Sequence, residues 1–374
     1  MVAFGRLGQP VSYRRPALRA LSTRLAAPVP KQARHDPDAR NVNEGTVKVT
    51  RPVRWGVMAT GGIAVAFAAD LANSDSGRVV AVGSRRAATA HTFGDRFDIP
   101  NRHGSYEALV ADPEVDVVYV ASPAPMHLDG ARLALRAGKP VLVEKPFTAD
   151  GVEAREFVAL ARDAGLFAME AMWTRFLPHM VEIRRLLAEA ALGRIVTVCA
   201  DHGQDIEGQD HRLFARELGG GALLDLGIYP VSFASMVLGT PERVISLVTP
   251  AFGGVDGQTS MLFGYGTGAH ASLTCTLSAR SPTRAAIVGT DARIEIDGEF
   301  YKPSSFTLTT RDGESVRFEG GHRDSGLPGS GLYYQADEVA RCLDEGLLES
   351  PIMPLEESVS IMQTMDAVQA AAAA

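Results

Sequence analysis

The hydrophobic positions of the chain follow two different patterns, one in each half. In the first half, short aliphatic runs alternate with amphipathic stretches, and the runs lack a polar residue at every second position. Strands of this kind are covered on both faces, which indicates a parallel sheet flanked by helices. The expected strands lie in "VRWGVM", "RVVAVG", "VDVVYVAS" and "PVLVEKP", and the expected helices in "GIAVAFAADLA", "HTFGDRFDI", "SYEALVADPEVD" and "HLDGARLALRAG".

In the second half, polar and apolar residues alternate. This period predicts strands of an antiparallel sheet with one covered face. The strands are expected in "RIVTVCAD", "RVISLVTP", "QTSMLFGY", "AHASLTCTLS", "RAAIVGT", "ARIEIDG" and "SFTLTT", before an amphipathic helix in "YYQADEVARCLDEG". We therefore predict an α/β protein with a doubly wound Rossmann domain over residues 51–172 and an α+β domain over residues 173–374.

Residues 1–50 differ from the rest in composition. The stretch "YRRPALRALSTRLAAPVPKQARHDPDARN" is rich in Arg and Ala, is interrupted by Pro, and lacks the apolar segment of a secretory signal. An organelle-type transit peptide has this composition, and so does a disordered tail or a stretch added by an upstream start codon. We favour the tail or start-codon reading and exclude these residues from the fold.

Composition and net charge limit the classes of partner that are expected for this protein. The chain has 374 residues, enough for about two domains, and a net charge of −7. Residues 1–35 contain six Arg and one Lys and no acid, so the remaining 30 basic and 44 acidic residues give a body charge near −14. An acidic body argues against nucleic acid as a partner. We find no apolar run of the roughly 20 residues that a membrane span needs, so no membrane partner is expected either.

The three cysteines, Cys199, Cys275 and Cys342, lie far apart in the sequence. This spacing predicts neither a disulfide framework nor a metal site, and a reducing, cytoplasmic location follows. The polar segment "ADHGQDIEGQDHRLF" has two His and several carboxylates, but it matches no metal-ligand spacing. We expect a polar loop over the active site there and no metal.

The turn after the first predicted strand is "ATGGIA", from Ala59 to Ala64. It fits the pattern G-x-G-x-x-G/A, with alanine in the first glycine position, and it lies between a strand and a helix. In that context, dinucleotide binding is a better interpretation than an ordinary turn. Alanine fits the first position if its φ is negative. The residues expected to contact the cofactor are Thr60, Gly61, Gly62 and Ile63.

The second predicted strand ends on Ser84, Arg85 and Arg86. A site for NAD usually has Asp or Glu here, to bind the ribose 2′-hydroxyl. An arginine pairs with a 2′-phosphate, which a carboxylate would repel. These residues therefore predict NADP as the cofactor, with NAD as the alternative. Two solvated arginines on a turn would give the same sequence.

The segment "VLVEKPFT" ends a predicted strand on Glu144, Lys145 and Pro146. Ligands bind open parallel sheets at the carboxyl ends of their strands, so the Lys145 ammonium is expected in the cleft. Later in the chain, Asp225 and Tyr229 are four residues apart in "LLDLGIYPV", which places them on one helix face. A nearby ammonium would stabilise the phenolate of Tyr229 and lower its pKa.

The segments "RWGVMATGGIA", "SYEALVADPEVDVVYVASPAPMH", "GKPVLVEKPFT", "EAMWTRFLP" and "GGGALLDLGIYPV" occur in this order. Over residues 52–370 the chain thereby resembles the Gfo/Idh/MocA family of oxidoreductases. The resemblance implies that Lys145, Asp225 and Tyr229 surround the substrate hydroxyl or carbonyl. It also implies further cofactor contacts: Ser122, Pro123, His127, Glu144, Lys145, Trp173 and Arg175. Finally, it implies an open-faced second sheet that packs in a homodimer or homotetramer.

These observations lead to one main hypothesis and two alternatives. We expect an NADP-dependent oxidoreductase that transfers a hydride between nicotinamide and a hydroxyl-bearing carbon of a sugar or cyclic diol, such as a D-xylose-type aldose or a trans-dihydrodiol. A glycosidase or epimerase that keeps and recycles its cofactor is the first alternative. A non-catalytic NADP sensor is the second, although the presence of both Lys145 and Tyr229 argues against it.

Overall fold

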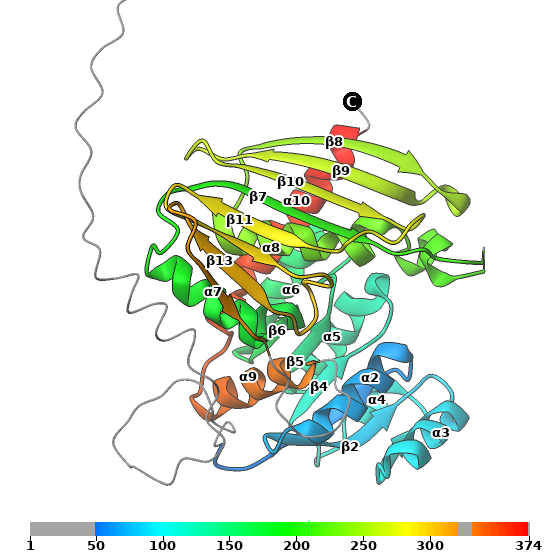
Figure 1. The fold of residues 1–374 in the computed structure, drawn as a ribbon. Helices are drawn as coiled ribbons and strands as arrows, with labels where there is room; N and C mark the ends of the chain where they lie inside the picture. Colours follow the sequence, from blue (N-terminus) through cyan, green and yellow to red (C-terminus); the bar gives the residue numbers. More distant parts are fainter. Residues whose placement is uncertain (1–48, 209, 321–330, 373–374) are drawn as a thin grey trace, which may run out of the picture.

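The computed structural model describes residues 49–208, 210–320 and 331–372. The predicted N-terminal extension therefore lies almost entirely outside the described residues. Two sheets dominate the molecule, and in Figure 1 they form its lower and upper parts. Both match the fold class predicted from the hydrophobic pattern.

The lower sheet has six strands in the order β3-β2-β1-β4-β5-β6, all parallel. Strands β4, β5 and β6 are buried at every residue, as expected for short apolar runs covered on both faces. The strands are β1 (Val53–Met58), β2 (Gly77–Gly83), β3 (Asn101–His103), β4 (Val117–Val120), β5 (Val141–Glu144) and β6 (Ala168–Ala171). The connecting helices are α2 (Gly62–Asp70), α3 (Ala87–Phe97), α4 (Tyr106–Val110), α5 (His127–Arg136) and α6 (Gly151–Ala164).

Local sequence explains where these helices begin and end. The Asp150 carboxylate accepts the backbone N–H groups of Val152 and Glu153 and so caps the first turn of α6. Gly165 ends the same helix with a left-handed φ of 61°. The cap fixes the first turn of α6, and that turn is where the loop that begins at Lys145 ends.

The upper sheet has eight strands in the order β14-β13-β12-β11-β7-β10-β9-β8. All neighbours are antiparallel except β7 and β10, which run parallel. The strands are β7 (Ile195–Gly203), β8 (Arg243–Pro250), β9 (Asp256–Gly264), β10 (His270–Thr276), β11 (Ala285–Gly289), β12 (Ala292–Ile296), β13 (Phe306–Thr310) and β14 (Ser315–Phe318). Of these, β14 was not predicted.

Helices cover one face of the upper sheet. They are α7 (Pro178–Ala188), the π-helix η6 (Leu223–Gly227), α8 (Ile228–Leu238) and α10 (Leu355–Ala372). The run Arg216–Leu238 is long and apolar enough to span a membrane by composition, which corrects our statement that no such run exists. In the fold, 67% of its most apolar window is buried, and α8 packs on β7 and β10. The run serves as a core helix because the sheet buries its apolar side chains.

The last part of the chain returns to the first domain. Helix α9 (Tyr333–Asp344) lies beside the lower sheet in Figure 1, although it follows the upper sheet in sequence. Its Asp337 accepts a hydrogen bond from Ser76 at 2.7 Å, and the Tyr333 N–H donates to Asp70 at 3.1 Å. Helix α10 packs on α6 as well as on α8 and β8. These contacts fix the two sheets relative to each other.

Candidate active site

A cleft of about 510 Å³ lies at the carboxyl ends of the lower-sheet strands. We call it the edge cleft; it is lined by Ala59, Thr60, Gly61, Ser84, Arg85, Arg86, Thr89, Tyr106, Ala121 and Pro123. Six of the fourteen predicted cofactor residues line it and come from three separate turns: Thr60, Gly61, Ser84, Arg85, Arg86 and Pro123. Gly62 and Ile63 belong to the first turn of α2 and are not among the lining residues.

The turn before α2 leaves room for a ligand. Gly61 precedes the helix without a side-chain cap, and a Cβ added at Gly61 or Gly62 would meet no atom within 4 Å. The first N–H groups of the nine-residue helix α2 thus have no side-chain cap among the described residues, and the glycines leave room for a ligand, which suits a pyrophosphate. Ala59, however, has a φ of 83°, so the condition under which alanine would fit this position easily is not met. A left-handed alanine costs about 1–2 kcal/mol.

Arg85 and Arg86 follow β2 and are exposed. Neither guanidinium forms an ion pair within the part of the chain that the structure describes. The Ser84 side chain is buried instead and lies 2.5 Å from the Thr89 hydroxyl, which holds the start of α3 against the strand. Two unpaired cations at the wall of the edge cleft fit a phosphate on the ribose of a dinucleotide.

The loop after β4 carries a second indication of a ligand. The Ser122 hydroxyl is buried and has no hydrogen-bond partner among residues 49–208, 210–320 and 331–372. Buried polar atoms are normally paired, so an orphaned hydroxyl beside the edge cleft fits a bound cofactor. The His127 ring is buried between two carbonyl groups, with nitrogens 2.9 Å from Pro146 O and 2.8 Å from Ser122 O. It ties the β4 loop to the β5 loop and does not line the cleft.

Lys145 directly follows β5, and its side chain reaches Asp225 and Tyr229, which lie on helices that cover the upper sheet. Its Nζ donates to the Asp225 backbone carbonyl at 2.9 Å, lies 3.4 Å from Asp225 Oδ1, and stands 4.9 Å from the centre of the Tyr229 ring. Burial alone would lower the pKa of this ammonium, but Asp225, with Tyr229 and Glu144, raises it. Lys145 is therefore a fixed cation near neutral pH. The peptide bond from Lys145 to Pro146 is cis.

Glu144, also a predicted cofactor residue, faces the interior instead. Its carboxylate accepts the hydroxyl of Tyr119 and, at 3.1 Å, the N–H of Lys145. Burial raises the pKa of Glu144 to about 7. Its contacts indicate that Glu144 holds the end of β5 rather than a ligand.

Asp225 lies in the π-helix η6, and Tyr229 in the first turn of α8. Burial would raise the pKa of Asp225, but Lys145 and Arg212 outweigh it and lower the pKa. Arg212 donates to Asp225 Oδ1 at 2.9 Å. We did not predict Arg212 as a site residue. The sequence signal that could have identified Arg212 is its position in the polar segment that ends in "DHRLF", which we expected to lie over the active site.

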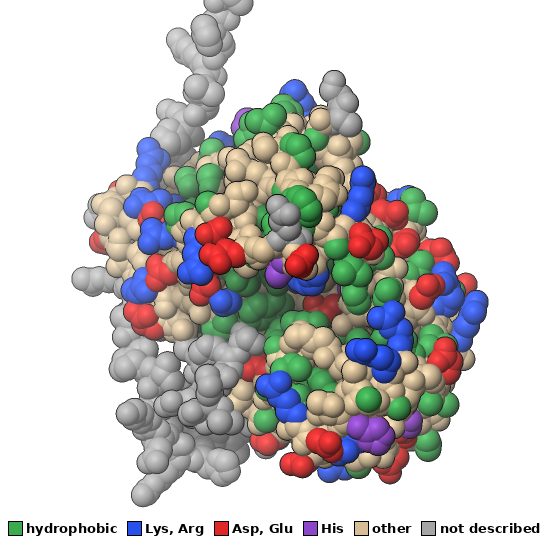
Figure 2. Space-filling model, turned by 90° about the vertical axis from the view of Figure 1, so that its right-hand side faces the viewer, with side chains coloured by type: hydrophobic (Ala, Val, Ile, Leu, Met, Phe, Trp, Pro, Cys, Tyr) green, Lys and Arg blue, Asp and Glu red, His purple; other side chains and the backbone are tan. Residues whose placement is uncertain are grey.

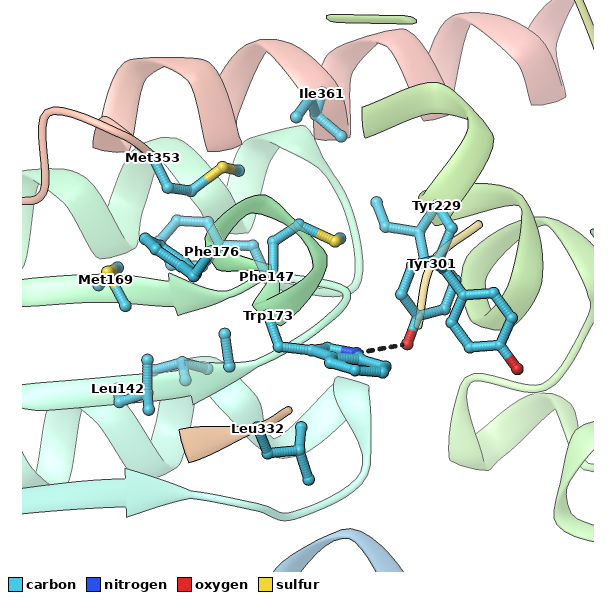
Figure 3. Packing of buried hydrophobic residues seen from close by; sticks show 14 of the residues in the cluster. Leu142, Phe147, Met169, Trp173, Phe176, Tyr229, Tyr301, Leu332, Met353 and Ile361 are labelled. Atoms are coloured by element: carbon cyan, nitrogen blue, oxygen red, sulfur yellow. Dashed lines mark hydrogen bonds between the residues drawn. The ribbon is translucent and has the colours of Figure 1, made fainter. Parts of the chain in front are cut away.

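The Tyr229 hydroxyl accepts a hydrogen bond from Trp173 Nε1 at 3.0 Å, drawn in Figure 3. Its ring also packs against Tyr301 and His202, with centroids 4.7 and 5.4 Å away. Burial raises the pKa of Tyr229 to about 12, although Lys145 and the indole N–H act in the opposite direction. Our expectation of a lowered pKa was wrong because complete burial of the phenol outweighs one ammonium. Tyr229 is thus protonated near neutral pH.

Trp173 and Arg175 belong to one short 3-10 helix, η3 (Trp173–Phe176). Arg175 is buried and donates to Ser232 Oγ at 3.0 Å, to Ser232 O at 2.8 Å and to Glu357 at 2.6 Å. These bonds connect η3 to α8 and α10. Arg175 therefore does not line the edge cleft, and the structure gives it the task of positioning Trp173.

A second cavity, of about 390 Å³, opens beyond the aromatic cluster around Tyr229. Polar side chains predominate among its lining residues: His202, Gly203, Gln204, Asp205, Arg280, Ser281, Pro282, Thr283, Gly298, Glu299, Tyr301 and Lys302. Burial, with help from Lys145, lowers the pKa of His202 to about 4, so this ring is neutral. Figure 2 shows the molecule hollowed between its two parts, with charged side chains on the rim.

The described residues contain no group of three or more His, Cys, Asp or Glu side chains that could hold a metal ion. Lys145, Asp225, Tyr229 and Arg212 are nevertheless brought together by contacts between their side chains. Together they offer two cations, a carboxylate and a protonated phenol. Such an arrangement suits proton transfer coupled to hydride transfer.

Comparison with known proteins agrees with this geometry. Residues 53–172 match the model of an oxidoreductase family with an NAD-binding Rossmann fold, and residues 180–295 match a GFO/IDH/MocA C-terminal domain. The chain is 37% identical over 321 residues to trans-1,2-dihydrobenzene-1,2-diol dehydrogenase of Mus musculus, covering 84% of this chain and 95% of the relative. The Homo sapiens protein of the same name is 35% identical over 333 residues, covering 85% and 96%.

Two solved structures have the same fold over most of the chain. Aldose-aldose oxidoreductase from Caulobacter crescentus, complexed with glycerol, is similar with a TM-score of 0.78 and 26% identity, covering 86% of this chain and 98% of that one. A 3-ketoreductase from Actinomadura kijaniata, in complex with NADP and TDP-benzene, has a TM-score of 0.75 and 28% identity, with the same coverage.

Proposed function

Because the chain belongs to the Gfo/Idh/MocA family of oxidoreductases, we propose that it is an NADP-dependent dehydrogenase acting on a hydroxyl-bearing carbon of a sugar or cyclic diol. The observation that carries the proposal is the convergence of Lys145, Asp225 and Tyr229. They come from the residue after β5, from η6 and from α8, and Lys145 Nζ lies 2.9 Å from the Asp225 carbonyl and 4.9 Å from the centre of the Tyr229 ring. Packing alone does not require charged groups to gather around one phenol, so their convergence indicates a functional site.

A nicotinamide cofactor, when bound, would supply the acceptor for a hydride, that is, the hydrogen of the substrate C–H bond with both bonding electrons. The substrate hydroxyl must also lose its proton for the carbonyl to form. Tyr229 takes that proton in this direction, for which its phenol must first lose its own proton; the Lys145 ammonium and the Trp173 N–H stabilise the resulting phenolate. In the reverse direction, the protonated phenol of Tyr229 gives its proton to the carbonyl oxygen. The pKa of about 12 favours this acid role near neutral pH.

A preference for NADP over NAD is the second part of the proposal. Support comes from Arg85 and Arg86, which follow β2, line the edge cleft and form no ion pair with any residue that the structure describes, and from the similar 3-ketoreductase structure, which contains NADP. Replacing Arg85 by Asp should repel a 2′-phosphate and shift the ratio of kcat/KM for NADP⁺ and NAD⁺ at least tenfold toward NAD⁺. The control is Arg78→Asp, an exposed position at the opposite end of the same strand. If the ratio of the two kcat/KM values were unchanged in Arg85→Asp, the proposed preference for NADP would be refuted.

The substrate class is tested by turnover. Purified protein is mixed with NADP⁺ or NAD⁺ and a panel of aldoses, inositols and trans-dihydrodiols, and growth of the NADPH or NADH absorbance is followed. Turnover of one class with NADP⁺ preferred supports the proposal. Silence over the whole panel, with NADPH still bound tightly, contradicts it and favours an enzyme that recycles a retained cofactor.

We also propose that two copies associate through the uncovered face of the upper sheet. Ile245 and Leu247 on β8, and Leu262 on β9, are 57%, 73% and 53% exposed. Ile245 pairs with Leu262 across the two strands, so the side chains form one apolar patch. Light scattering after gel filtration at micromolar concentration should give twice the mass of one chain. A single-chain mass would refute the association.

A further inference from the structure

Arg212 is the charged residue of the site to which none of the steps above assigns a task. It lies in the 3-10 helix η4 (Arg212–Phe214), between β7 and η6. Its side chain is 55% exposed, whereas those of its neighbours Asp225 and Lys145 are 15% and 12% exposed. Arg212 therefore covers the catalytic carboxylate from the open side of the site.

The backbone around Arg212 is held in place, although the side chain is exposed. Leu213 is 2% exposed, and the Phe214 and Ala215 N–H groups donate to His211 and Arg212 carbonyls at 2.9 and 3.0 Å. The guanidinium uses only its Nη2 on Asp225, at 2.9 Å. Its Nε and Nη1 have no partner within the described parts of the chain. A fixed backbone thus presents free N–H donors at the mouth of the site.

Stability alone explains this arrangement poorly. Exposed ion pairs contribute little to folding, and Asp225 already has a buried cation partner in Lys145, with Nζ 2.9 Å from its carbonyl and 3.4 Å from its carboxylate. A second, half-exposed cation is unnecessary for neutralising Asp225. The free donors of Arg212 instead suit a ligand oxygen that approaches Asp225 from the solvent side.

We propose that Arg212 binds substrate, and that Arg212 and Asp225 together recognise the hydroxyl on the carbon next to the one that reacts. This inference rests on the proposed dehydrogenase function. A hydroxyl both donates and accepts, and the pair offers one acceptor, the Asp225 carboxylate, beside free donors, the Arg212 N–H groups. The proposed function places the reacting hydroxyl at Tyr229 and Lys145, and Asp225 Oδ1 lies within 3.4 Å of Lys145 and 2.9 Å of Arg212. Two hydroxyls on adjacent carbons stand side by side, as these two halves of the site do.

The test compares a vicinal diol with its analogue that lacks the neighbouring hydroxyl, for example an aldose and its 2-deoxy form. In Arg212→Gln, kcat/KM for the diol should fall roughly 10- to 100-fold, because a charge-assisted hydrogen bond is lost. Turnover of the deoxy analogue should stay within about threefold of the wild type, since it never used that bond. Arg212→Lys keeps the charge but loses the fork, and should recover only part of the discrimination.

Arg216→Gln is the matched control. Arg216 lies one short helix further along, is exposed, and lines a different cavity, so both substrates should be unaffected. Equal losses for the diol and the deoxy analogue in Arg212→Gln would overturn the inference, because Arg212 would then act only on the charge of Asp225. No loss for either substrate would overturn it as well.

Binding measurements separate this inference from the proposed function. The chain has two tryptophans, and Trp173 touches Tyr229, so fluorescence can report ligand binding to the protein–NADPH complex without turnover. If the wild type binds the diol at least tenfold more tightly than its deoxy analogue and Arg212→Gln abolishes the difference, the inference stands even without activity. Absence of turnover would then refute only the proposed function. Equal affinities for both ligands in the wild type would refute the inference itself.

Discussion

Replacement of Tyr229 by Phe is the most direct test of the proposed acid–base group. The substitution removes one oxygen and leaves the ring between Tyr301 and His202. A positioned proton donor or acceptor contributes about 10²- to 10⁴-fold to rate, which corresponds to about 3–5 kcal/mol of transition-state stabilisation. We therefore expect kcat to fall by that factor in both reaction directions.

The structure also predicts how Tyr229→Phe changes the free energy of unfolding and the affinity for NADPH. The Trp173 N–H, on a side chain that is 6% exposed, loses its acceptor, so the free energy of unfolding should fall by about 1–3 kcal/mol. The affinity for NADPH should stay within about twofold, because Tyr229 is not among the residues that line the edge cleft. If activity were lost through poor cofactor binding, the affinity for NADPH would fall as well.

Three measurements are needed on the same preparation: kcat from the NADPH absorbance, Kd for NADPH from its fluorescence, and stability from urea unfolding. Tyr265→Phe is the control, because Tyr265 is buried too and its hydroxyl has no partner within the described residues. It should leave kcat unchanged. If kcat of Tyr229→Phe falls less than about tenfold, or no more than in the control, the acid–base assignment is refuted.

The remaining predictions concern strain and pH. Ala59→Gly should raise the free energy of unfolding by about 1 kcal/mol, because relief of the left-handed φ of 83° outweighs the added freedom of glycine in the unfolded chain; urea unfolding that shows a loss of stability would contradict it. Burial raises the pKa of Glu170 from 4.5 to about 7. The folded state therefore keeps a proton that the unfolded state releases, and stability falls as the pH rises from about 5 to 7. Glu170→Gln should remove this dependence, so that between pH 5 and pH 8 the variant loses roughly 2–3 kcal/mol less than the wild type. If urea unfolding showed the wild type and Glu170→Gln losing equal free energy of unfolding between pH 5 and pH 8, Glu170 would not titrate in this way.

Much of the architecture could be predicted because it depends on local periodicity. Unbroken aliphatic runs identified four of the six parallel strands, β1, β2, β4 and β5, and alternating positions identified the upper sheet except β14. The short strands β3 and β6 were not predicted. The glycine turn, the two arginines after β2 and the "EKP" segment could be found for a related reason: each follows a strand directly, and parallel strands end at one edge. The family resemblance that these segments carry was confirmed.

What the sequence could not determine concerns contacts between distant residues. Arg175 looked like a cofactor residue, but Ser232 and Glu357 use its donors. The pKa of Tyr229 depends on how completely the phenol is buried, and burial is a property of the whole packed site. The pairing of Arg212 with Asp225 joins two segments that approach only when η4 folds over η6. The sequence alone determined which chemical groups are present and where each strand delivers them. Only the tertiary structure decided their neighbours and their charge states, because electrostatic and hydrogen-bond energies depend on distance and burial rather than on position along the chain.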